Sequence, residues 1–323
     1  MRVGLLGLGR IGMFHAATLS TLVDDLVVSD VDHTRAEEVA GRLKARVGDP
    51  FDADAVVIAT PTSTHAEALL RASDLGMPAF CEKPAAPTVA ETRRVAEAVK
   101  RSGIAVHIGF QRRFDAGYTA AREALRGGDL GELHRVHLLT ADPRPPAAEY
   151  VALSGGIFRD CHIHDFDILR WVTGREVDTV YATGSNRGEA FFAEAGDVDN
   201  SAALMTMDDG TLVTLQGSRY NGAGYDVRME LAGTRATWAA GLGYRTPLRS
   251  AEGFDPGGDP WPDFQARFDT AYVAEMRAFL AMARGERESP CTVQDALSAL
   301  YLAEAADLSL REGRPIRLLE VTK

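Results

Sequence analysis

Short apolar segments alternate with amphipathic segments over roughly the first 110 residues. A short apolar run between turn residues predicts a buried strand, and apolar residues spaced three and four apart predict a helix that packs by one face. Their alternation predicts βαβ units, in which helices cover both faces of a parallel sheet. The expected strands are Val3–Leu6, Leu26–Ser29, Ala55–Ala59, Ala79–Cys81 and Ala105–Gly109, and the expected helices are Ile11–Leu22, Thr34–Ala45, Thr64–Leu75 and Val89–Arg101.

The pattern changes after about residue 120, where longer stretches alternate apolar and polar residues. Such alternation predicts strands with one buried face, and Asp208–Gly210 supplies a hairpin turn between two of them. This half therefore predicts an open, mostly antiparallel sheet with few helices. The expected strands are Leu133–Thr140, Val177–Thr183, Ala202–Met207, Thr211–Gly217 and Asp226–Ala232, the expected loops are Asp142–Pro146 and Gly253–Pro262, and the expected helices are Gly156–Thr173, Tyr272–Arg284 and Val293–Arg311.

The composition is ordinary for a globular protein, with 46% hydrophobic and 25% charged residues among 323. A formal net charge of −11 repels phosphate backbones and anionic lipids, so we expect neither nucleic acid nor a membrane as a partner. The cysteines, Cys81, Cys161 and Cys291, are sparse and odd in number, which is typical of a reducing compartment. The apolar run Val3–Leu8 is too short for a secretion signal. We expect a soluble, cytoplasmic protein.

A glycine-rich turn lies between the first expected strand and the first expected helix, with the sequence Gly7-Leu8-Gly9-Arg10-Ile11-Gly12. In a G-x-G-x-x-G turn the first glycine makes the bend, the second lets a pyrophosphate approach, and the third lets the helix pack on the strand. The helix N-terminus then faces the anion. We expect Gly7, Gly9, Arg10, Ile11 and Gly12 to bind a dinucleotide, and the alternative is a glycine-rich turn without a ligand.

The second expected strand ends at Asp30, which lies 23 residues after Gly7. This is close to the spacing of about 20 at which an acidic residue binds the adenosine ribose. A carboxylate there would repel a 2′-phosphate, which favours NAD over NADP. Arg35 is the nearby cation that would favour NADP, and we expect it on the solvent face of the following helix.

The third expected strand runs into the turn Thr60-Pro61-Thr62-Ser63-Thr64-His65. Ligands of doubly wound sheets bind beyond the carboxyl ends of the strands, so this turn should line the cofactor channel. We therefore expect Thr60, Pro61 and His65 to contact the cofactor. For Ser63 and Thr64, capping of the next helix is as good an interpretation as contact with the cofactor.

Lysine is rare in this chain, where only four of the 35 basic residues are lysines: Lys44, Lys83, Lys100 and Lys323. Lys83 lies in Glu82-Lys83-Pro84, directly after an expected strand, and the proline excludes a helix interior. This places Lys83 at the carboxyl edge of the sheet, beside the expected nicotinamide. The alternative is an exposed loop lysine.

A second cluster of polar residues lies in Gly155–Asp167. Asp160, His164 and Asp167 occur at i, i+4 and i+7, so they would share one face of a helix, which Trp171 extends. The rest of that helix is apolar, which predicts burial. Two carboxylates and an imidazole are costly on a buried helix unless they face a wet cleft or a polar ligand. The cluster therefore predicts a functional site.

A metal site is the alternative, because Cys161, His162 and His164 resemble a run of ligands. On a helix, Cys161 and His162 point away from the face that carries Asp160 and His164, so the four cannot converge on one ion. Asp160 and His164 alone lack an evident third ligand. We expect no metal.

These motifs resemble the glucose–fructose oxidoreductase, inositol dehydrogenase and rhizopine-catabolism family of NAD(P)-dependent oxidoreductases, over nearly the whole chain. The resemblance rests on Gly7–Gly12, Glu82–Pro84, Gly109–Asp115 and Gly155–Asp167. Within the family, the chain is most similar to inositol 2-dehydrogenases. The stretches that carry this closer similarity are Asp142–Tyr150, Gly196–Asp199 and Gly224–Asp226.

The resemblance implies an α/β protein with an NAD-binding Rossmann domain at 1–118. It implies a second α+β domain at 119–323, with an open, mostly antiparallel sheet that binds substrate and forms dimers or tetramers. The family's catalytic residues correspond to Lys83, Asp160 and His164. Its substrate contacts correspond to these three residues and to Arg113, Asp167 and Tyr225, and its remaining cofactor contacts to Glu82, Lys83 and Gln111, where Gln111 replaces an asparagine.

The expected reaction is NAD-linked oxidation of a secondary hydroxyl on a cyclic polyol, with myo-inositol and its 2-keto product as the first candidates. His164 would accept the hydroxyl proton, Lys83 would bind the reacting oxygen, and Asp160 would share the substrate hydroxyl and hold the imidazole. One alternative is another sugar or polyol dehydrogenase of the family, including an NADP-linked one. Another is a non-catalytic regulator that senses the dinucleotide, against which the intact Lys83, Asp160 and His164 argue.

Overall fold

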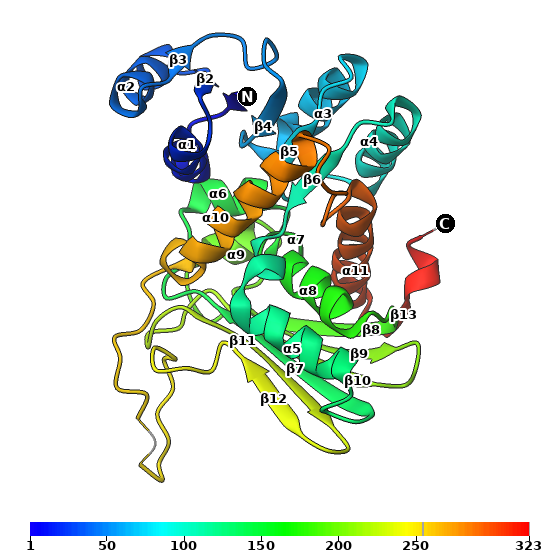
Figure 1. Ribbon diagram of the computed structural model, residues 1–323. Coiled ribbons are helices and arrows are strands. Elements are labelled where there is room, and N and C mark those ends of the chain that lie inside the picture. The colour runs from blue at the N-terminus through cyan, green and yellow to red at the C-terminus, as the bar shows by residue number, and fades with distance from the viewer. Residues whose placement is uncertain (254, 323) are drawn as a thin grey trace. The chain divides into compact units, whose positions relative to one another are not determined.

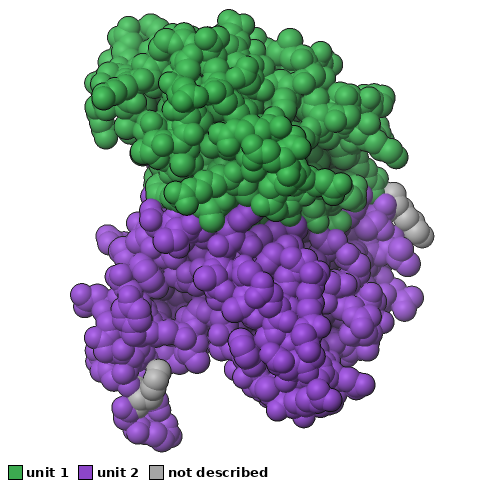
Figure 2. Space-filling view, in the orientation of Figure 1, with its two compact units in different colours: residues 1–111, 272–298 green, residues 112–271, 299–323 purple. Residues whose placement is uncertain are grey.

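The computed structural model describes every residue except Phe254 and Lys323, so the expected loop Gly253–Pro262 lies partly outside the described residues. The chain forms two compact units, shown in different colours in Figure 2. The first contains Met1–Gln111 and Tyr272–Ser298, and the second contains Arg112–Ala271 and Ala299–Lys323. The first unit thus includes a segment from near the C-terminus that the sequence pattern did not connect with it. The domain bounds 1–118 and 119–323 stay a prediction.

The first unit contains a parallel six-stranded sheet in the order β3-β2-β1-β4-β5-β6. This is the strand order of a dinucleotide-binding Rossmann fold. Helices connect most of the strands that follow one another in the chain (Figure 1). The short β3 was not expected. The strands are β1 (Arg2–Leu6), β2 (Asp25–Ser29), β3 (Arg46–Val47), β4 (Ala55–Ile58), β5 (Ala79–Glu82) and β6 (Val106–Gly109), and the helices are α1 (Arg10–Leu22), α2 (His33–Leu43), α3 (His65–Asp74) and α4 (Val89–Ser102).

The core of the first unit is built from the apolar strands and from one face of each helix. β4 is buried along its whole length, as expected for a central parallel strand with helices on both faces. Met276 and Phe279 of α10 (Phe264–Ala283) belong to the same hydrophobic cluster as Val3 and Leu5 of β1. This packing explains why the segment from near the C-terminus belongs to the first unit.

The second unit contains a seven-stranded sheet in the order β12-β11-β7-β10-β9-β8-β13. Only β7 and β10 pair in parallel, so the sheet is mixed and mostly antiparallel, as expected. The expected turn Asp208–Gly210 connects β9 to β10, and Gly210 has a φ of +88° there. The strands are β7 (Leu133–Ala141), β8 (Val177–Ser185), β9 (Asn200–Met207), β10 (Leu212–Ser218), β11 (Asp226–Gly233), β12 (Thr237–Ala240) and β13 (Ile316–Arg317).

Three helices of the second unit were not expected from the sequence: α5 (Ala116–Gly127), α6 (Ala148–Ser154) and α9 (Phe191–Glu194). The buried residues of α5, Tyr118, Ala121 and Ala124, recur every three positions, so a helical pattern is present in this segment. The side chain of Asp115 caps its first turn and Gly128 ends it, which are further signals that could have found it. Helix α11 (Val293–Glu312) was expected, and its residues divide between the two units.

The expected single helix Gly156–Thr173 is wrong, because the structure has two helices there, α7 (Ile157–Asp160) and α8 (Ile163–Thr173). The regular α-helical hydrogen bonds are interrupted between them, where the amide of His162 bonds to the carbonyl of Ile157, five residues earlier, at 3.1 Å. Asp160 therefore ends one helix, whereas His164 and Asp167 lie on the next.

Alternate residues of the second sheet face opposite sides. Tyr181, Leu204, Thr214, His137 and Glu230 pair across β8, β9, β10, β7 and β11, and none of them is buried. Their sequence neighbours on these strands face the core. Helices α5 and α8 lie together along one side of the sheet (Figure 1). In the described part of the chain, no helix is long and apolar enough to cross a membrane.

Candidate active site

The three glycines of the G-x-G-x-x-G turn meet three different steric conditions. Gly7 has a φ of +93°, and a Cβ there would lie 2.7 Å from the carbonyl oxygen of Ala59. A Cβ on Gly12 would lie 2.1 Å from the carbonyl oxygen of Gly7. A Cβ on Gly9 would meet nothing within 4 Å, so the turn is open at that point. This is the arrangement that a pyrophosphate needs, because it approaches the backbone at the second glycine.

Helix α1 begins at Arg10 without a side-chain cap and without an acidic residue in its first turn. By contrast, Asp32, Thr88 and Asp115 cap α2, α4 and α5 with their side chains. Amides that no side chain caps, together with the positive end of the helix dipole, suit an anion. The turn therefore fits the pyrophosphate of NAD, with Arg10 and Ile11 in the first turn of the helix.

Asp30 lies at the carboxyl end of β2, next to the glycine turn. Its Oδ2 accepts a hydrogen bond from the amide of Leu8 at 2.6 Å, and its Oδ1 accepts one from the amide of Asp32 at 2.9 Å. Arg35 is exposed, as expected, but its guanidinium also reaches Asp30 at 3.4 Å and Asp32 at 3.1 Å. Its position in the first turn of α2 keeps it close to the end of β2.

The Thr60–His65 turn is held by its own side chains. The hydroxyl of Thr64 bonds to Thr60 Oγ1 at 2.7 Å and to the carbonyl of Pro61 at 2.9 Å, and Thr64 makes no capping bond to α3. The ring of His65 is buried, with Nδ1 2.7 Å from the carbonyl oxygen of Pro84 and Nε2 2.8 Å from that of Thr60. Burial lowers the pKa of His65, although both carbonyls oppose this. His65 thus joins the Thr60 turn to the segment that carries Lys83.

Lys83 follows the last residue of β5 and is partly buried. Its amide donates to Oε2 of Glu82 at 3.3 Å, and Oε1 of Glu82 lies 2.7 Å from Nε2 of the buried His15. Gln111 is buried just beyond the end of β6. Lys83 therefore lies at the carboxyl edge of the sheet, as the sequence predicted.

Asp160 is held by two side chains of the second unit. Tyr150 Oη donates to its Oδ1 at 2.7 Å, and Arg219 Nη2 donates to its Oδ2 at 2.7 Å. Desolvation of its hydroxyl and the charge of Asp160 raise the pKa of Tyr150, although about half of the residue is exposed, so the hydroxyl remains a donor. Arg219 also contacts Asp142 at 3.1 Å. Sequence reasoning assigned no role to Arg219 or to the Tyr150 hydroxyl.

Two consecutive arginines form buried ion pairs with α8. Arg113 binds Asp167 through two nitrogens, with Nε 2.8 Å from Oδ2. Arg112 pairs with Asp165, which also accepts from Thr140 Oγ1 at 2.9 Å. Burial opposes ionisation of Asp165, but the Arg112 charge lowers its pKa below the usual range.

The arginines correct one step of the sequence argument. The carboxylates Asp160 and Asp167 do not need a wet cleft or a ligand, because Arg219 and Arg113 compensate their charges. The sequence signal for these ion pairs was the pair Arg112-Arg113, followed about fifty residues later by Asp165 and Asp167.

Two further candidate residues lie in the second unit. His164 is half-buried at the start of α8. Tyr225 is buried, and its amide bonds to the carbonyl of Trp261 at 3.0 Å.

The residues of the alternative metal site have separate hydrogen-bond partners. His162 Nδ1 lies 2.8 Å from Asp165, and its Nε2 lies 2.8 Å from Ser201 Oγ. The thiol of Cys161 donates to Asp142 at 3.7 Å. Among the described residues, no three histidine, cysteine or acidic side chains are grouped so that they could hold a metal ion.

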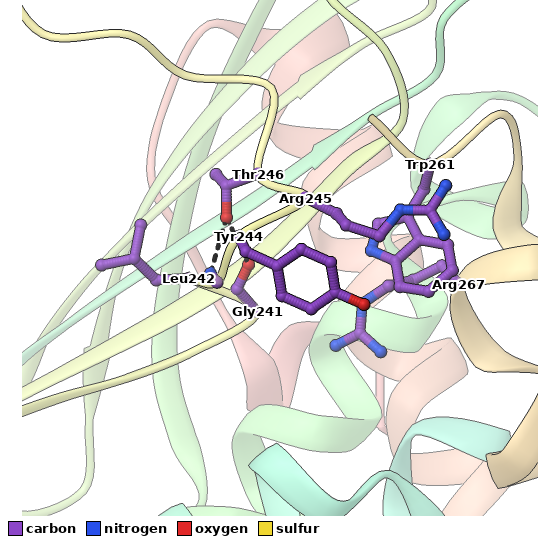
Figure 3. A pocket seen from close by; sticks show the side chains of 8 residues that line it. Gly241, Leu242, Tyr244, Arg245, Thr246, Trp261 and Arg267 are labelled. Carbon is purple, nitrogen blue, oxygen red and sulfur yellow. Dashed lines mark hydrogen bonds between the residues drawn. The ribbon is translucent and has the colours of Figure 1, made fainter. Parts of the chain in front are cut away.

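An open pocket of the second unit is lined by none of the candidate residues (Figure 3). The guanidinium of Arg245 lies 3.8 Å from the centre of the Trp261 ring, and Arg267 donates to Asp115 at 2.6 Å. Thr246 Oγ1 accepts from the amide of Gly243 at 2.7 Å and closes the turn. Both arginines of the pocket are thus already engaged within the second unit.

Comparisons with known proteins identify relatives of this chain over nearly its whole length. Residues 1–110 match the model of the oxidoreductase family with an NAD-binding Rossmann fold, and residues 118–239 match that of the GFO/IDH/MocA C-terminal domain. Myo-inositol 2-dehydrogenase of Thermotoga maritima is 33% identical, over 99% of this chain and 99% of its own. The NAD(+)-dependent scyllo-inositol 2-dehydrogenase of Bacillus subtilis is 35% identical, over 98% of this chain and 96% of its own.

A solved structure is similar over the whole length. The scyllo-inositol dehydrogenase of Lactobacillus casei, crystallised with NAD(H) and scyllo-inositol, superposes with a TM-score of 0.88 at 27% identity and covers 99% of both chains. The first unit of the present chain is an NAD-binding Rossmann domain, and its G-x-G-x-x-G turn and Asp30 fit that cofactor. The chain belongs to the GFO/IDH/MocA family of NAD-dependent oxidoreductases.

Proposed function

We propose that this enzyme oxidises a secondary hydroxyl of a cyclic polyol with NAD, and that myo-inositol, giving the 2-keto inositol, is its first candidate substrate. The names of relatives that cover nearly the whole chain support this class of substrate. The single structural observation that carries it is the fixed carboxylate of Asp160, which Tyr150 and Arg219 hold by one oxygen each. A carboxylate held in this way accepts hydrogen bonds from hydroxyl groups, which is what polyol recognition requires.

The proposed catalytic residues are Lys83, Asp160 and His164. When bound, NAD supplies the acceptor for the hydride that leaves the carbinol carbon. The imidazole of His164 accepts the hydroxyl proton as the carbonyl forms, which typically contributes about 10²–10⁴ in rate. Lys83 donates a hydrogen bond to the reacting oxygen and stabilises its developing negative charge. Asp160 shares the hydrogen bond of that hydroxyl and orients it for transfer of its proton to His164.

The remaining contacts are assigned by the same proposal. Gly7, Gly9, Arg10, Ile11 and Gly12 bind the pyrophosphate, and Asp30 binds the adenosine ribose. Further cofactor contacts come from Thr60, Pro61, His65, Glu82, Lys83 and Gln111. Arg113, Asp167 and Tyr225 bind substrate together with the catalytic residues. Arg113 and Asp167 form a buried ion pair, which supports a rigid surface for substrate binding.

The experiment is a panel of cyclitols and aldoses with NAD and with NADP, followed by NADH absorbance for the wild type, Lys83→Ala and His164→Ala. We expect turnover of myo-inositol or scyllo-inositol and a loss of kcat by orders of magnitude in both variants. Binding of NAD should survive, because the pyrophosphate and ribose contacts lie elsewhere. In His164→Ala the residual rate should rise with pH, since hydroxide replaces the missing base. Near wild-type kcat in both variants would remove these residues from the mechanism. Turnover of aldoses alone would favour the sugar dehydrogenase alternative.

We also propose a cytoplasmic homo-oligomer, a dimer or tetramer, that associates through the outer face of the second sheet. Its free cysteines suit a reducing compartment. On β8, β9 and β10 the outer face presents Tyr181, Leu204 and Leu212, which are 40%, 50% and 52% exposed. Light scattering should give a multiple of 34.8 kDa, and Leu204→Lys should shift it toward the monomer. A wild-type monomer at micromolar concentration would refute this assembly.

A further inference from the structure

Two buried side chains of the first unit form a chain of contacts that ends at Lys83. His15 lies in the middle of α1, is 1% exposed, and has Nε2 2.7 Å from Oε1 of Glu82. The other oxygen of that carboxylate, Oε2, accepts from the amide of Lys83 at 3.3 Å. One carboxylate therefore connects the helix that begins at the glycine turn with the backbone of the lysine.

The hydrogen-bonding role of His15 follows from its surroundings. Within the described residues, its Nδ1 has no hydrogen-bond partner, whereas Nε2 faces a carboxylate. An ionised carboxylate only accepts hydrogen bonds, so the N–H at Nε2 donates to Glu82. The rings of Phe80 and Tyr272 pack edge-on against His15, with centroids 5.3 Å and 6.1 Å away, so the ring has little freedom to turn.

The carboxylate of Glu82 is confined from the opposite side as well. Gly109 of β6 pairs with Glu82 in the sheet, and a Cβ there would lie 3.2 Å from Oε2 of Glu82 and 2.9 Å from Phe80 Cζ. The glycine thus leaves just enough room for the carboxylate beside the strand. A buried carboxylate needs hydrogen bonds to offset its desolvation, and His15 provides one.

We propose that His15 and Glu82 are positioning residues for Lys83. Glu82 fixes the backbone at Lys83 by accepting from its amide, and His15 fixes Glu82. His65 holds the other side of the same segment through the carbonyl of Pro84. The inference rests on the proposed function, in which the amine of Lys83 binds the reacting oxygen. A misplacement of about 1 Å at such a group costs about a hundredfold in rate.

The test compares His15→Leu, which removes the donor, with His15→Gln, which keeps an N–H donor of similar reach. Each change is made in the wild type and in Lys83→Ala, and kcat, KM for the polyol and the Kd of NAD are measured. In the wild type, His15→Leu should lower kcat about tenfold to a hundredfold, while the Kd of NAD changes less than about threefold. His15→Gln should restore most of the loss. In Lys83→Ala, neither change should lower the residual kcat further.

His107 provides a matched control, because it is a fully buried histidine on β6 that lies 3.4 Å from the buried Glu275. His107→Gln should lower the thermal midpoint without the selective loss of kcat. If His15→Leu does not fold, Glu82→Gln replaces it, since the amide keeps the shape and loses one acceptor. Glu82→Gln should also lower kcat only in the presence of Lys83.

Two results would overturn the inference. An equal loss of kcat from His15→Leu with and without Lys83 would make His15 a structural residue, as would a loss confined to NAD affinity. A wild-type kcat in Lys83→Ala itself would instead show that the proposed function of Lys83 is at fault. The two failures are therefore distinguishable.

Discussion

The two units stabilise their buried polar groups in different ways. Around Lys83 in the first unit, the contacts are made by imidazole rings: His15 binds Glu82, and His65 binds the carbonyls of Thr60 and Pro84. Around α8 in the second unit, the carboxylates are paired with arginines: Arg112 with Asp165 and Arg113 with Asp167. One region uses hydrogen bonds from groups that can be neutral, and the other uses permanent charges.

This difference determines what a substitution does. Removal of one member of a buried ion pair leaves the other charge unpaired in a poorly solvated place, which is strongly destabilising. Removal of a neutral hydrogen-bond donor leaves an acceptor unsatisfied, which is less costly. We therefore expect changes in these ion pairs of the second unit to appear mainly in the free energy of unfolding. Changes near Lys83 should be smaller there and should appear in kcat or in pH dependence.

The largest effect on stability is expected for Asp165→Asn. The change keeps the shape of the side chain but leaves the guanidinium of Arg112 uncompensated, with both residues almost fully buried. The free energy of unfolding, measured in urea, should fall by about 3–5 kcal/mol. Glu176→Gln is the control, because Glu176 pairs with Arg170 but is 55% exposed, and it should change the free energy by less than about 1 kcal/mol. Equal losses of stability in Asp165→Asn and Glu176→Gln would mean that water solvates the charges of Arg112 and Asp165.

A smaller effect is expected for Arg219→Met. Its partners Asp160 and Asp142 keep 11% and 23% of their side chains exposed, so water can replace part of the lost interaction. The free energy of unfolding should fall by about 1–3 kcal/mol. Burial already raises the pKa of Asp142 against the opposing charge of Arg219. Without Arg219 the carboxyl should take up a proton more readily, so the deficit should be smaller near pH 5 than near pH 8; a constant deficit would contradict this account.

Much of the fold was predictable from the sequence, because strands such as Ala55–Ile58 are buried throughout, whereas β9 and β10 of the second sheet alternate between buried and more exposed residues. The helix α5 was missed although Tyr118, Ala121 and Ala124 recur at helical spacing and Asp115 and Gly128 mark its ends. The break between α7 and α8 was also missed. It depends on contacts of His162 with Asp165 and with Ser201, a residue distant in the sequence.

The candidate site was predictable only as a set of residue types. The glycine turn, Asp30 and Lys83 lie at strand ends, and the order of strands fixes where those ends lie. The partners Arg219 and Tyr150 of Asp160 were not assigned, because they lie 59 and 10 residues away in sequence. Nothing in local periodicity connects them with Asp160. Pairing through tertiary structure is thus the part that the sequence pattern did not supply.

The pH dependence of stability tests the neutral state of His65. Burial lowers the pKa of His65 in the folded protein, so the unfolded chain binds a proton near pH 6.5 that the folded chain does not. The stabilisation is fully present above that pH and is lost as the pH falls below it, by at most about 1.4 kcal/mol per pH unit for one group. His65→Gln should have a flatter slope between pH 7 and pH 5 than the wild type. An unchanged slope would mean that an imidazolium donates to both carbonyls.

The smallest effect on stability is expected at Asp30, where the first unit does use an arginine but an exposed one. Arg35 is 46% exposed, so loss of its pairing with Asp30 should cost less than about 1 kcal/mol. The change should appear instead in cofactor choice. Asp30→Asn keeps an acceptor for the amide of Leu8 but removes the charge that repels a 2′-phosphate. The ratio of kcat/KM for NADP to that for NAD should rise about tenfold, which corresponds to about 1.4 kcal/mol.

Asp32→Asn is the matched control, because Asp32 contacts the same arginine but does not bind Leu8. In this variant the ratio should stay within about threefold of the wild-type value. Arg35→Ala should lower the ratio, because it removes the one cation beside the two carboxylates among the described contacts of Asp30. If Asp30→Asn leaves the ratio unchanged while Arg35→Ala lowers it, Arg35 rather than Asp30 determines the cofactor preference.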